Sequence, residues 1–444
     1  MINNMGNTIT DQQITKGLTV FDNIDGKLLT ALNSCVHCGL CATSCPVFLA
    51  TKDEKLTPAH KVDLVASIYK KYCTFSGKLF PGLVSAKAID DELVEEMVDQ
   101  LFGACTMCGR CNIHCSIGVD IEYLVRTGRT MLANMDKVPS TLQSTVDSAL
   151  NTGNNMAIPT EEFVDTLEWL EEDLQDDLED ETAKIPLNEI EKKYLYTLNP
   201  REPKFFPLSI SAMAKVFHVA KESWTLSTKM YDVTNYAYFS GNPEHAKIIA
   251  KRLDDEMEEL KAEECVLAEC GHGSRSFRWE APNYLDKKLD YNVLTSVELL
   301  AEYLRDGRIK TDPNLIEEVV TLHDPCNLVR GGGVIDEQRY ILSKTVKNFV
   351  EMTPHGTESF CCGGGGGHLA MSEYNERRMK MGELKAEQIR KTGATIVATP
   401  CHNCVDQLIQ INHAFKLNVQ IKTLAEIVAD SIVINSEDKN RIQD

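Results

Sequence analysis

The sequence has no run of about 20 apolar residues, the length that a helix needs to cross a bilayer. Its first residues, MINNMGNTITDQQITKG, lack the apolar stretch of a signal peptide. We therefore expect a cytoplasmic protein that reaches a membrane only through a partner subunit. Positive charge is also scarce, since 46 Lys and Arg stand against 66 Asp and Glu. The net charge of -20 argues against binding to nucleic acid.

Cysteine, by contrast, is abundant, with 16 in a chain of 444 residues. A disulfide framework is typical of short secreted chains, whereas this chain is long enough for two or three domains and its cysteines lie in tight clusters. We therefore interpret most of them as thiolates that bind metal in a reducing compartment.

Two runs, CVHCGLCATSCP and CTMCGRCNIHCS, share the spacing C-x2-C-x2-C-x3-C. This is the spacing of bacterial two-cluster ferredoxins, in which three close thiolates hold one 4Fe-4S cube and the fourth reaches across to the other. Four-thiolate zinc sites also use C-x2-C, but two copies of the longer run favour iron-sulfur. In the second run Ser116 replaces the usual proline, which is not a ligand.

We assign these eight cysteines to two 4Fe-4S cubane clusters in a crossed arrangement. The alternative, in which each run serves its own cluster, uses the same eight ligands. Since four thiolates complete each cube, His37 and His114 within the runs are expected to be neighbours of a cluster or exposed. The predicted first cluster has Cys35, Cys38, Cys41 and Cys115 as ligands, and the second has Cys105, Cys108, Cys111 and Cys45.

The pattern of apolar residues predicts an α+β protein. Residues 1–30 form a polar extension, and 31–145 a helical ferredoxin-like domain with two clusters. Residues 146–210 form an acidic segment, either a solvated linker helix or a partner-docking arm. Residues 211–435 form an α/β domain of two Rossmann-like repeats, because helices alternate there with short strands that end at cysteines.

The two repeats are about 130 residues apart. The first contains KAEECVLAEC, which ends at Cys270, and the second contains KTGATIVATPC, which ends at Cys401. Five further cysteines have the pattern C-x34-C-C-G-x37-C-x2-C, in the segments HDPC, CCGGGGG and TPCHNC. Five thiolates exceed what one tetrahedral zinc or one cubane uses. These cysteines are Cys326, Cys361, Cys362, Cys401 and Cys404.

These segments resemble the CCG domain of the heterodisulfide reductase family, and the whole layout resembles the D-type subunit of that family and the DsrK-type subunits. The resemblance implies that the five cysteines hold one noncubane 4Fe-4S cluster, which cleaves a disulfide in two one-electron steps. The first repeat is degenerate, because it keeps Cys270 but has Gly273 in place of the second cysteine and no CC pair. One noncubane cluster, as in the DsrK-type branch, is therefore expected.

Several polar residues adjoin these cysteines. His323 and His402 are candidates for delivering a proton to a departing thiolate, as is His368, and Arg330 is a candidate for holding an anionic group. A structural hydrogen bond is the alternative for each. His272 and Arg275, in the degenerate repeat, are expected to border a substrate pocket.

The five glycines 363–367 are expected to pack against a cluster and to present amide groups to it. Nucleotide binding is not favoured, because no Gly-Lys-Ser/Thr follows them. Cys73 and Cys265 have no motif companions, so we expect both to be buried structural thiols.

The resemblance implies an iron-sulfur subunit of a larger redox complex of anaerobic respiration. Its two cubane clusters would pass electrons to or from the noncubane cluster, which reacts with a disulfide, trisulfide or thiol. Expected partners are a membrane cytochrome b or a flavin-containing subunit, and a small thiol or disulfide protein or cofactor. The alternative is an electron-relay or docking subunit of a flavin, cytochrome b or acyl-CoA-reducing complex, with no substrate of its own.

Overall fold

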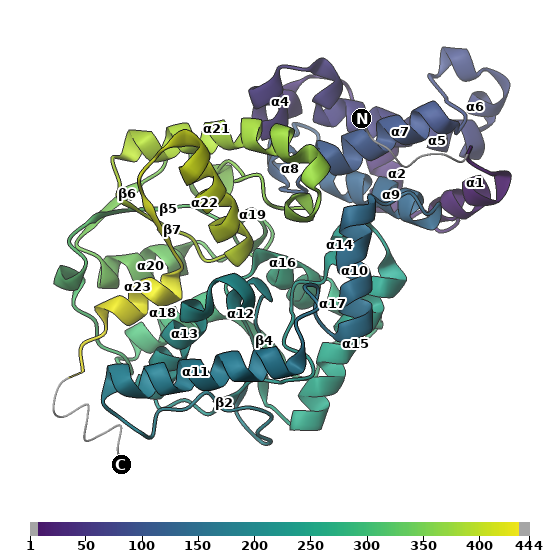
Figure 1. Cartoon of the computed structure of the whole chain (residues 1–444). Coiled ribbons are helices and arrows are strands. Elements are labelled where there is room, and N and C mark those ends of the chain that lie inside the picture. Colours follow the sequence, from purple (N-terminus) through teal and green to yellow (C-terminus); the bar gives the residue numbers. More distant parts are fainter. Residues whose placement is uncertain (1–7, 435–444) are drawn as a thin grey trace. The chain divides into compact units, whose positions relative to one another are not determined.

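The computed structural model describes residues 8–434, and in Figure 1 they form a mixture of helices and sheets. The chain divides into two compact units, each assembled from segments that are distant in sequence. The first unit comprises Met1–Ser144, Tyr236–Pro243 and Phe360–Lys385, and the second comprises Thr145–Asn235, Glu244–Ser359 and Ala386–Asp444.

The first unit begins with a series of helices, several of which start at a capping residue that the sequence shows. Asp25, Thr57 and Asp90 cap three of them, each accepting a hydrogen bond from the backbone amide three residues later. The helices are α1 (Asp11–Leu18), α2 (Gly26–Asn33), α3 (Leu40–Ser44), α4 (Pro46–Thr51), α5 (Pro58–Cys73), α6 (Phe75–Leu79), α7 (Asp91–Val98), the π-helical turn Asp99–Gly103, α8 (Arg110–Ile113) and α9 (Ile121–Asn134).

The second unit contains two four-stranded parallel sheets with the same topology. The first has the order β2-β1-β3-β4 and the second β6-β5-β7-β8. The mixed helix-and-sheet class predicted from the sequence is confirmed. The strands are β1 (Tyr194–Tyr196), β2 (Trp224–Thr225), β3 (Glu264–Leu267), β4 (Asn292–Thr295), β5 (Val319–Leu322), β6 (Asn348–Glu351), β7 (Ile396–Ala398) and β8 (Gln420–Lys422).

Other helices precede, connect or follow these strands. Thr295 and Thr423 begin α18 and α23 with the same capping box, each directly after the last strand of its sheet. The helices are α10 (Ser140–Thr152), α11 (Thr160–Leu178), α12 (Arg201–Phe205), α13 (Pro207–Val219), α14 (Tyr236–Ser240), α15 (Pro243–Leu260), α16 (Gly271–Gly273), the π-helical turn Ser274–Trp279, α17 (Ala281–Leu285), α18 (Ser296–Arg305), α19 (Cys326–Val329), α20 (Asp336–Thr345), α21 (Asn375–Thr392), α22 (His402–Phe415) and α23 (Leu424–Ser431).

Strands β5 and β7 are neighbours at the middle of the second sheet. Leu322 pairs with Ala398, and the amide of His323 donates to the carbonyl oxygen of Ala398 at 2.8 Å. The chain runs from β5 into HDPC and from β7 into TPC, so both cysteine segments leave the same, carboxyl edge of the sheet.

The acidic helix α11 is amphipathic and packs into the second unit. Phe163 and Leu167 are buried in its hydrophobic core, and the Phe163 ring stacks on Tyr231 with 4.1 Å between ring centroids. The acidic side chains lie toward the exposed face, where Trp169 is 51% exposed. Among the described residues, no helix has both the length and the apolar character needed to cross a membrane.

Replacing Leu167 with Ala should lower the free energy of unfolding by about 2–5 kcal/mol, because it opens a cavity in a packed core. The matched control Trp169→Ala, on the exposed face of the same helix, should change it by less than about 0.5 kcal/mol. Urea denaturation followed by circular dichroism measures both values. Equal, near-zero effects would mean that α11 is a solvated linker.

Candidate metal centres

One cavity of the first unit is lined by cysteines from both runs. Its cysteines are the first three of the first run and the last of the second. Cys38, on the exposed side, has its pKa lowered by a hydrogen bond from the Leu40 amide. Exposed His37 pairs with Asp63 at 2.8 Å. The four cysteines of this first cavity are Cys35, Cys38, Cys41 and Cys115.

A second cavity is lined by the other four cysteines of the two runs, the set that the crossed arrangement predicts. Desolvation raises the pKa of Cys111 well above its usual value, and raises that of Cys45 and Cys105. Apolar residues, among them Val47 and Val125, complete the wall. The four cysteines of this second cavity are Cys45, Cys105, Cys108 and Cys111.

The two cysteine loops have the same backbone shape. Gly39 and Gly109 adopt φ values of +81° and +69°, and each starts a short helix after the second cysteine of its run. Left-handed backbone at these positions favours glycine. Four sulfur donors around a small, largely apolar cavity fit a 4Fe-4S cube, which is held by four thiolates.

Two buried cations adjoin the second cavity. Lys61 lines it, is 2% exposed, and donates to the carbonyl oxygen of Leu56 at 2.8 Å. Arg129 has no exposed surface and donates to the carbonyl oxygen of Cys105 at 2.7 Å. Burial lowers the pKa of Arg129 to about 10, so it remains a cation at neutral pH. Neither residue was predicted from the motifs, since the one local signal of each is a basic side chain on the apolar face of a helix.

The glycine run belongs to the first unit and packs beside the second cavity. Gly366, with φ of +63°, lies so close to Thr106 that a Cβ atom would stand 2.6 Å from the Thr106 carbonyl carbon. Its carbonyl oxygen accepts a hydrogen bond from Arg129 at 2.8 Å. Buried His368 contacts the carbonyl oxygen of Phe102 at 2.7 Å, and burial lowers its pKa to about 3. The run is therefore closely packed protein rather than a linker.

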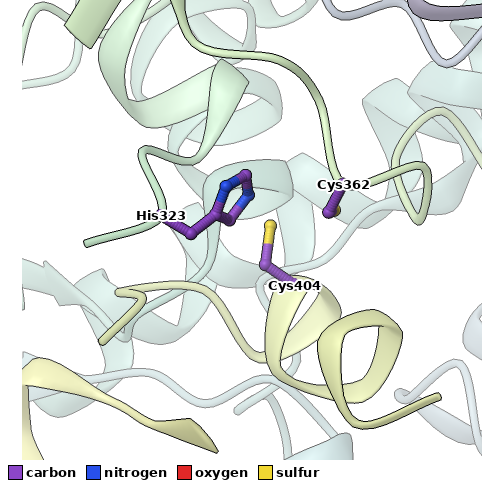
Figure 2. Close-up of side chains that lie close together, drawn as sticks. All are labelled: His323, Cys362 and Cys404. Atoms are coloured by element: carbon purple, nitrogen blue, oxygen red, sulfur yellow. The ribbon is translucent and has the colours of Figure 1, made fainter. Parts of the chain in front are cut away.

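In the second unit, three of the CCG cysteines follow strands β5 and β7. Cys326 begins α19, while Cys401 precedes α22 and Cys404 lies in its first turn. Figure 2 shows the Cys404 sulfur directed toward the His323 ring, and ligand atoms of these two residues lie within 4.8 Å of each other.

The CC pair is part of the other unit. Figure 2 also labels Cys362, which with Cys361 lies in Phe360–Lys385 of the first unit. Both cysteines are buried, and the amides of Gly363 and Gly364 donate to their sulfurs at 3.4 and 3.5 Å. The predicted five-cysteine set therefore draws its members from both units.

Cys270 of the degenerate repeat adjoins the second repeat's motif. The Gly271 amide donates to the Cys401 sulfur at 3.4 Å, and the Gly273 amide to the Cys270 sulfur at 3.3 Å. A hydrogen bond with Cys404 lowers the pKa of Cys401 to about 7, whereas burial raises that of Cys270. The repeat pattern identified Cys270, but not its place beside a motif cysteine.

His402 and Arg330, two of the polar residues predicted to act beside the CCG cysteines, both contact backbone carbonyl groups. His402 is 1% exposed, with Nδ1 at 3.2 Å from the carbonyl oxygen of Glu269 and 3.4 Å from Oε1 of Glu202, and burial lowers its pKa to about 3. Arg330 donates to the carbonyl oxygen of Ser359 at 2.7 Å. It thereby holds the segment that leads into Cys361.

Four further residues named in the sequence analysis have defined surroundings. His272 is hydrogen-bonded to Asn403, and Arg275 is paired with Glu280 at 3.1 Å. Cys265 is buried in β3, as expected. The expectation that Cys73 is buried is wrong, because this last residue of α5 is exposed.

Comparison with known proteins supports the two-part layout. Residues 31–119 match the family described as 4Fe-4S dicluster domain, and residues 320–409 match CCG, the cysteine-rich domain. The resemblance predicted from the motifs is confirmed.

Curated relatives are similar over most of the chain. The D-type subunit of dihydromethanophenazine:CoB--CoM heterodisulfide reductase from Methanosarcina barkeri is 26% identical, over 93% of this chain and 98% of the relative. The Hdr-like menaquinol oxidoreductase iron-sulfur subunit of Archaeoglobus profundus is 25% identical, over 91% and 80%. EtfAB:quinone oxidoreductase of Syntrophomonas wolfei is 21% identical, over 89% and 57%.

The cysteine cavities, the two domain matches and the relatives point to one conclusion. The chain is an iron-sulfur protein with a 4Fe-4S dicluster domain and a CCG domain, similar over most of its length to the D-type subunit of heterodisulfide reductase.

Proposed function

We propose that the chain is the electron-transfer subunit of a redox complex and that its CCG cysteines hold a noncubane 4Fe-4S cluster that reacts with a disulfide, trisulfide or thiol. The observation that carries the proposal is the sorting of eight cysteines into two four-cysteine cavities, with the CC-containing segment packed beside the second. Relatives named as subunits of oxidoreductases support it. Its partners are then a membrane cytochrome b or a flavin-containing subunit.

The path of electrons follows from the two cavities. The first cavity, with exposed Cys38, is the side that accepts or releases electrons at the surface. The second is buried among Lys61 and Arg129, whose charges offset the negative charge of a thiolate-bound cluster. Arg129 holds the carbonyl groups of both Cys105 and Gly366, so it fixes the spacing between the second cluster's loop and the glycine run.

At the CCG motif, side chains of the protein position the cysteine segments and hold a proton for the substrate. When bound, a noncubane cluster supplies the two one-electron steps that cleavage of a disulfide needs. Arg330 fixes the backbone at Ser359, before the CC pair. His323, beside Cys404, is the group that holds a proton for a departing thiolate. Neutral His402 positions the loop through its contact with the Glu269 carbonyl group.

A pure electron relay is the second candidate. The observation that favours it is the loss of cysteines from the first repeat, in which Gly273 occupies the position that corresponds to Cys404 in the second. Addition of a thiol or disulfide to the oxidised protein separates the two. A changed EPR signal from the CCG cluster supports a substrate, and an unchanged signal with every thiol class supports the relay.

Purified anaerobically, the protein should contain about twelve iron atoms, four for each of three clusters. Cys362→Ser should remove only the CCG cluster's EPR signal and leave about eight iron atoms, because both ferredoxin-type cavities keep their ligands. Cys73→Ser, at an exposed cysteine outside all three sets, is the control and should retain all the iron. Equal loss of every signal in Cys362→Ser would contradict the three-site assignment.

Lys61→Met should lower the reduction potential of the second cluster by tens of millivolts, on the order expected when a buried charge near a cluster is removed. The first cluster should be unaffected, since Lys61 lines only the second cavity. EPR-monitored redox titration measures both potentials. The matched control is Lys55→Met, an exposed lysine in the same region of the chain.

The crossed ligation can be tested by combining these changes. Cys115→Ser should destroy the first cluster, so Lys61→Met should still shift the potential of the ferredoxin-type cluster that remains. In Cys45→Ser, the added Lys61→Met change should leave the reduction potential of the remaining cluster unchanged. If each run instead serves its own cluster, the two results are exchanged.

A further inference from the structure

An exposed apolar surface lies at the end of α5, outside every site described above. Four large side chains, two in α6, one directly after it and one in the 3-10 turn Pro81–Leu83, are 79%, 54%, 58% and 85% exposed. Figure 1 shows α6 just beyond the end of α5. We call these side chains the apolar tip; they are Phe75, Leu79, Phe80 and Leu83.

The tip is held out by a folded loop. Thr74 caps α6 by accepting a hydrogen bond from the Gly77 amide at 3.1 Å. Gly77 lies against Lys70 so closely that a Cβ atom would stand 1.9 Å from its carbonyl oxygen. The Lys87 amide closes the loop by donating to the Ser67 carbonyl oxygen at 3.1 Å. The exposure of the four side chains is therefore a property of the folded loop.

The charge around the tip is opposite to that of the chain. Residues 64–89 contain four lysines and no Asp or Glu, although the whole chain has a net charge of -20. Acids border this region: Asp63 and Asp90 flank it in the sequence, and Glu96 lies 3.9 Å from Lys87. Burial raises the pKa of the Cys73 thiol, and the nearby charge of Asp22 adds to that effect. The lysines of the segment are Lys70, Lys71, Lys78 and Lys87.

We propose that, in contrast to the expectation that only a partner subunit contacts the membrane, the apolar tip itself inserts into the headgroup region of an anionic lipid bilayer. Aromatic and aliphatic side chains flanked by lysines are the composition that binds membrane interfaces, where the apolar groups leave water and the ammonium groups meet anionic headgroups. The tip projects from a short helix and turn, a shape that enters a bilayer without a preformed groove. A protein partner would instead have to supply a complementary apolar cavity.

This placement relates the membrane surface to the cysteine cavities. Pro58 and Lys61 line the second cavity and Ala59 and Val62 the first, all near the start of α5. The tip follows the other end of this helix, which is 16 residues, or about 24 Å, long. Insertion would hold both cavities near the bilayer without burying them. The inference does not rest on the chemistry of the CCG motif.

Flotation of the purified full chain with lipid vesicles tests the proposal. The protein should float with vesicles of phosphatidylcholine and phosphatidylglycerol in equal parts, and much less with phosphatidylcholine alone. Phe75→Ser combined with Leu83→Ser should weaken binding about tenfold or more, because both apolar anchors are lost. The matched control combines Phe205→Ser and Leu315→Ser, two exposed apolar residues elsewhere that are 54% and 56% exposed, and should bind like the wild type.

A second measurement locates the contact. Phe80→Trp should give added fluorescence that brominated lipid in anionic vesicles quenches, relative to the same titration of the wild type. The proposal would be overturned if the wild type did not bind anionic vesicles, or if the Phe75→Ser, Leu83→Ser variant bound them as well as the wild type. Binding without quenching of the tryptophan at position 80 would overturn it too. If the tip docks on a protein subunit, the pure chain does not float, which is one of these results.

Discussion

The guanidinium group of Arg129 joins four chain segments within the first unit. It donates hydrogen bonds to the carbonyl oxygens of Leu101, Cys105, Phe239 and Gly366. A cation without exposed surface is costly to bury unless its donors are satisfied, so these carbonyl groups must occupy defined positions. The cysteine loop of the second cavity and the glycine run are thereby fixed relative to each other.

The second unit uses one architecture twice and places different residues on the two copies. Both sheets have the same strand order, and after the second strand of each, β2 or β6, the chain supplies a segment to the first unit. In the first copy this segment is the short stretch Tyr236–Pro243, and in the second it carries the CC pair and the glycines. Functional groups were thus concentrated on one copy of a duplicated fold, while Cys270 remains beside Cys401.

The electrostatics of the two cavities differ although their cysteine spacings are identical. The first cavity has the exposed Cys38, with the His37–Asp63 pair at its entrance. The second has buried Lys61 and Arg129 beside it. The spacing within a run brings three cysteines together and packing between the runs adds the fourth, whereas buried charges beside such a site tune how readily a cluster there accepts an electron.

The sequence by itself determined the features that depend on near neighbours. The cysteine spacing in each run, and the strands that lie a few residues before cysteines, depend on adjacent residues, so these were predicted from the motifs. The tertiary structure alone decided the features that depend on distant segments. Packing between elements that lie far apart in the chain sets the burial of Lys61 and Arg129 and the exposure of Cys73. It also sets which cysteines line each cavity, for which the motifs favoured the crossed sets but left the alternative open. A local pattern contains the chemistry of a ligand, but only the packed fold determines its neighbours and its distance from water.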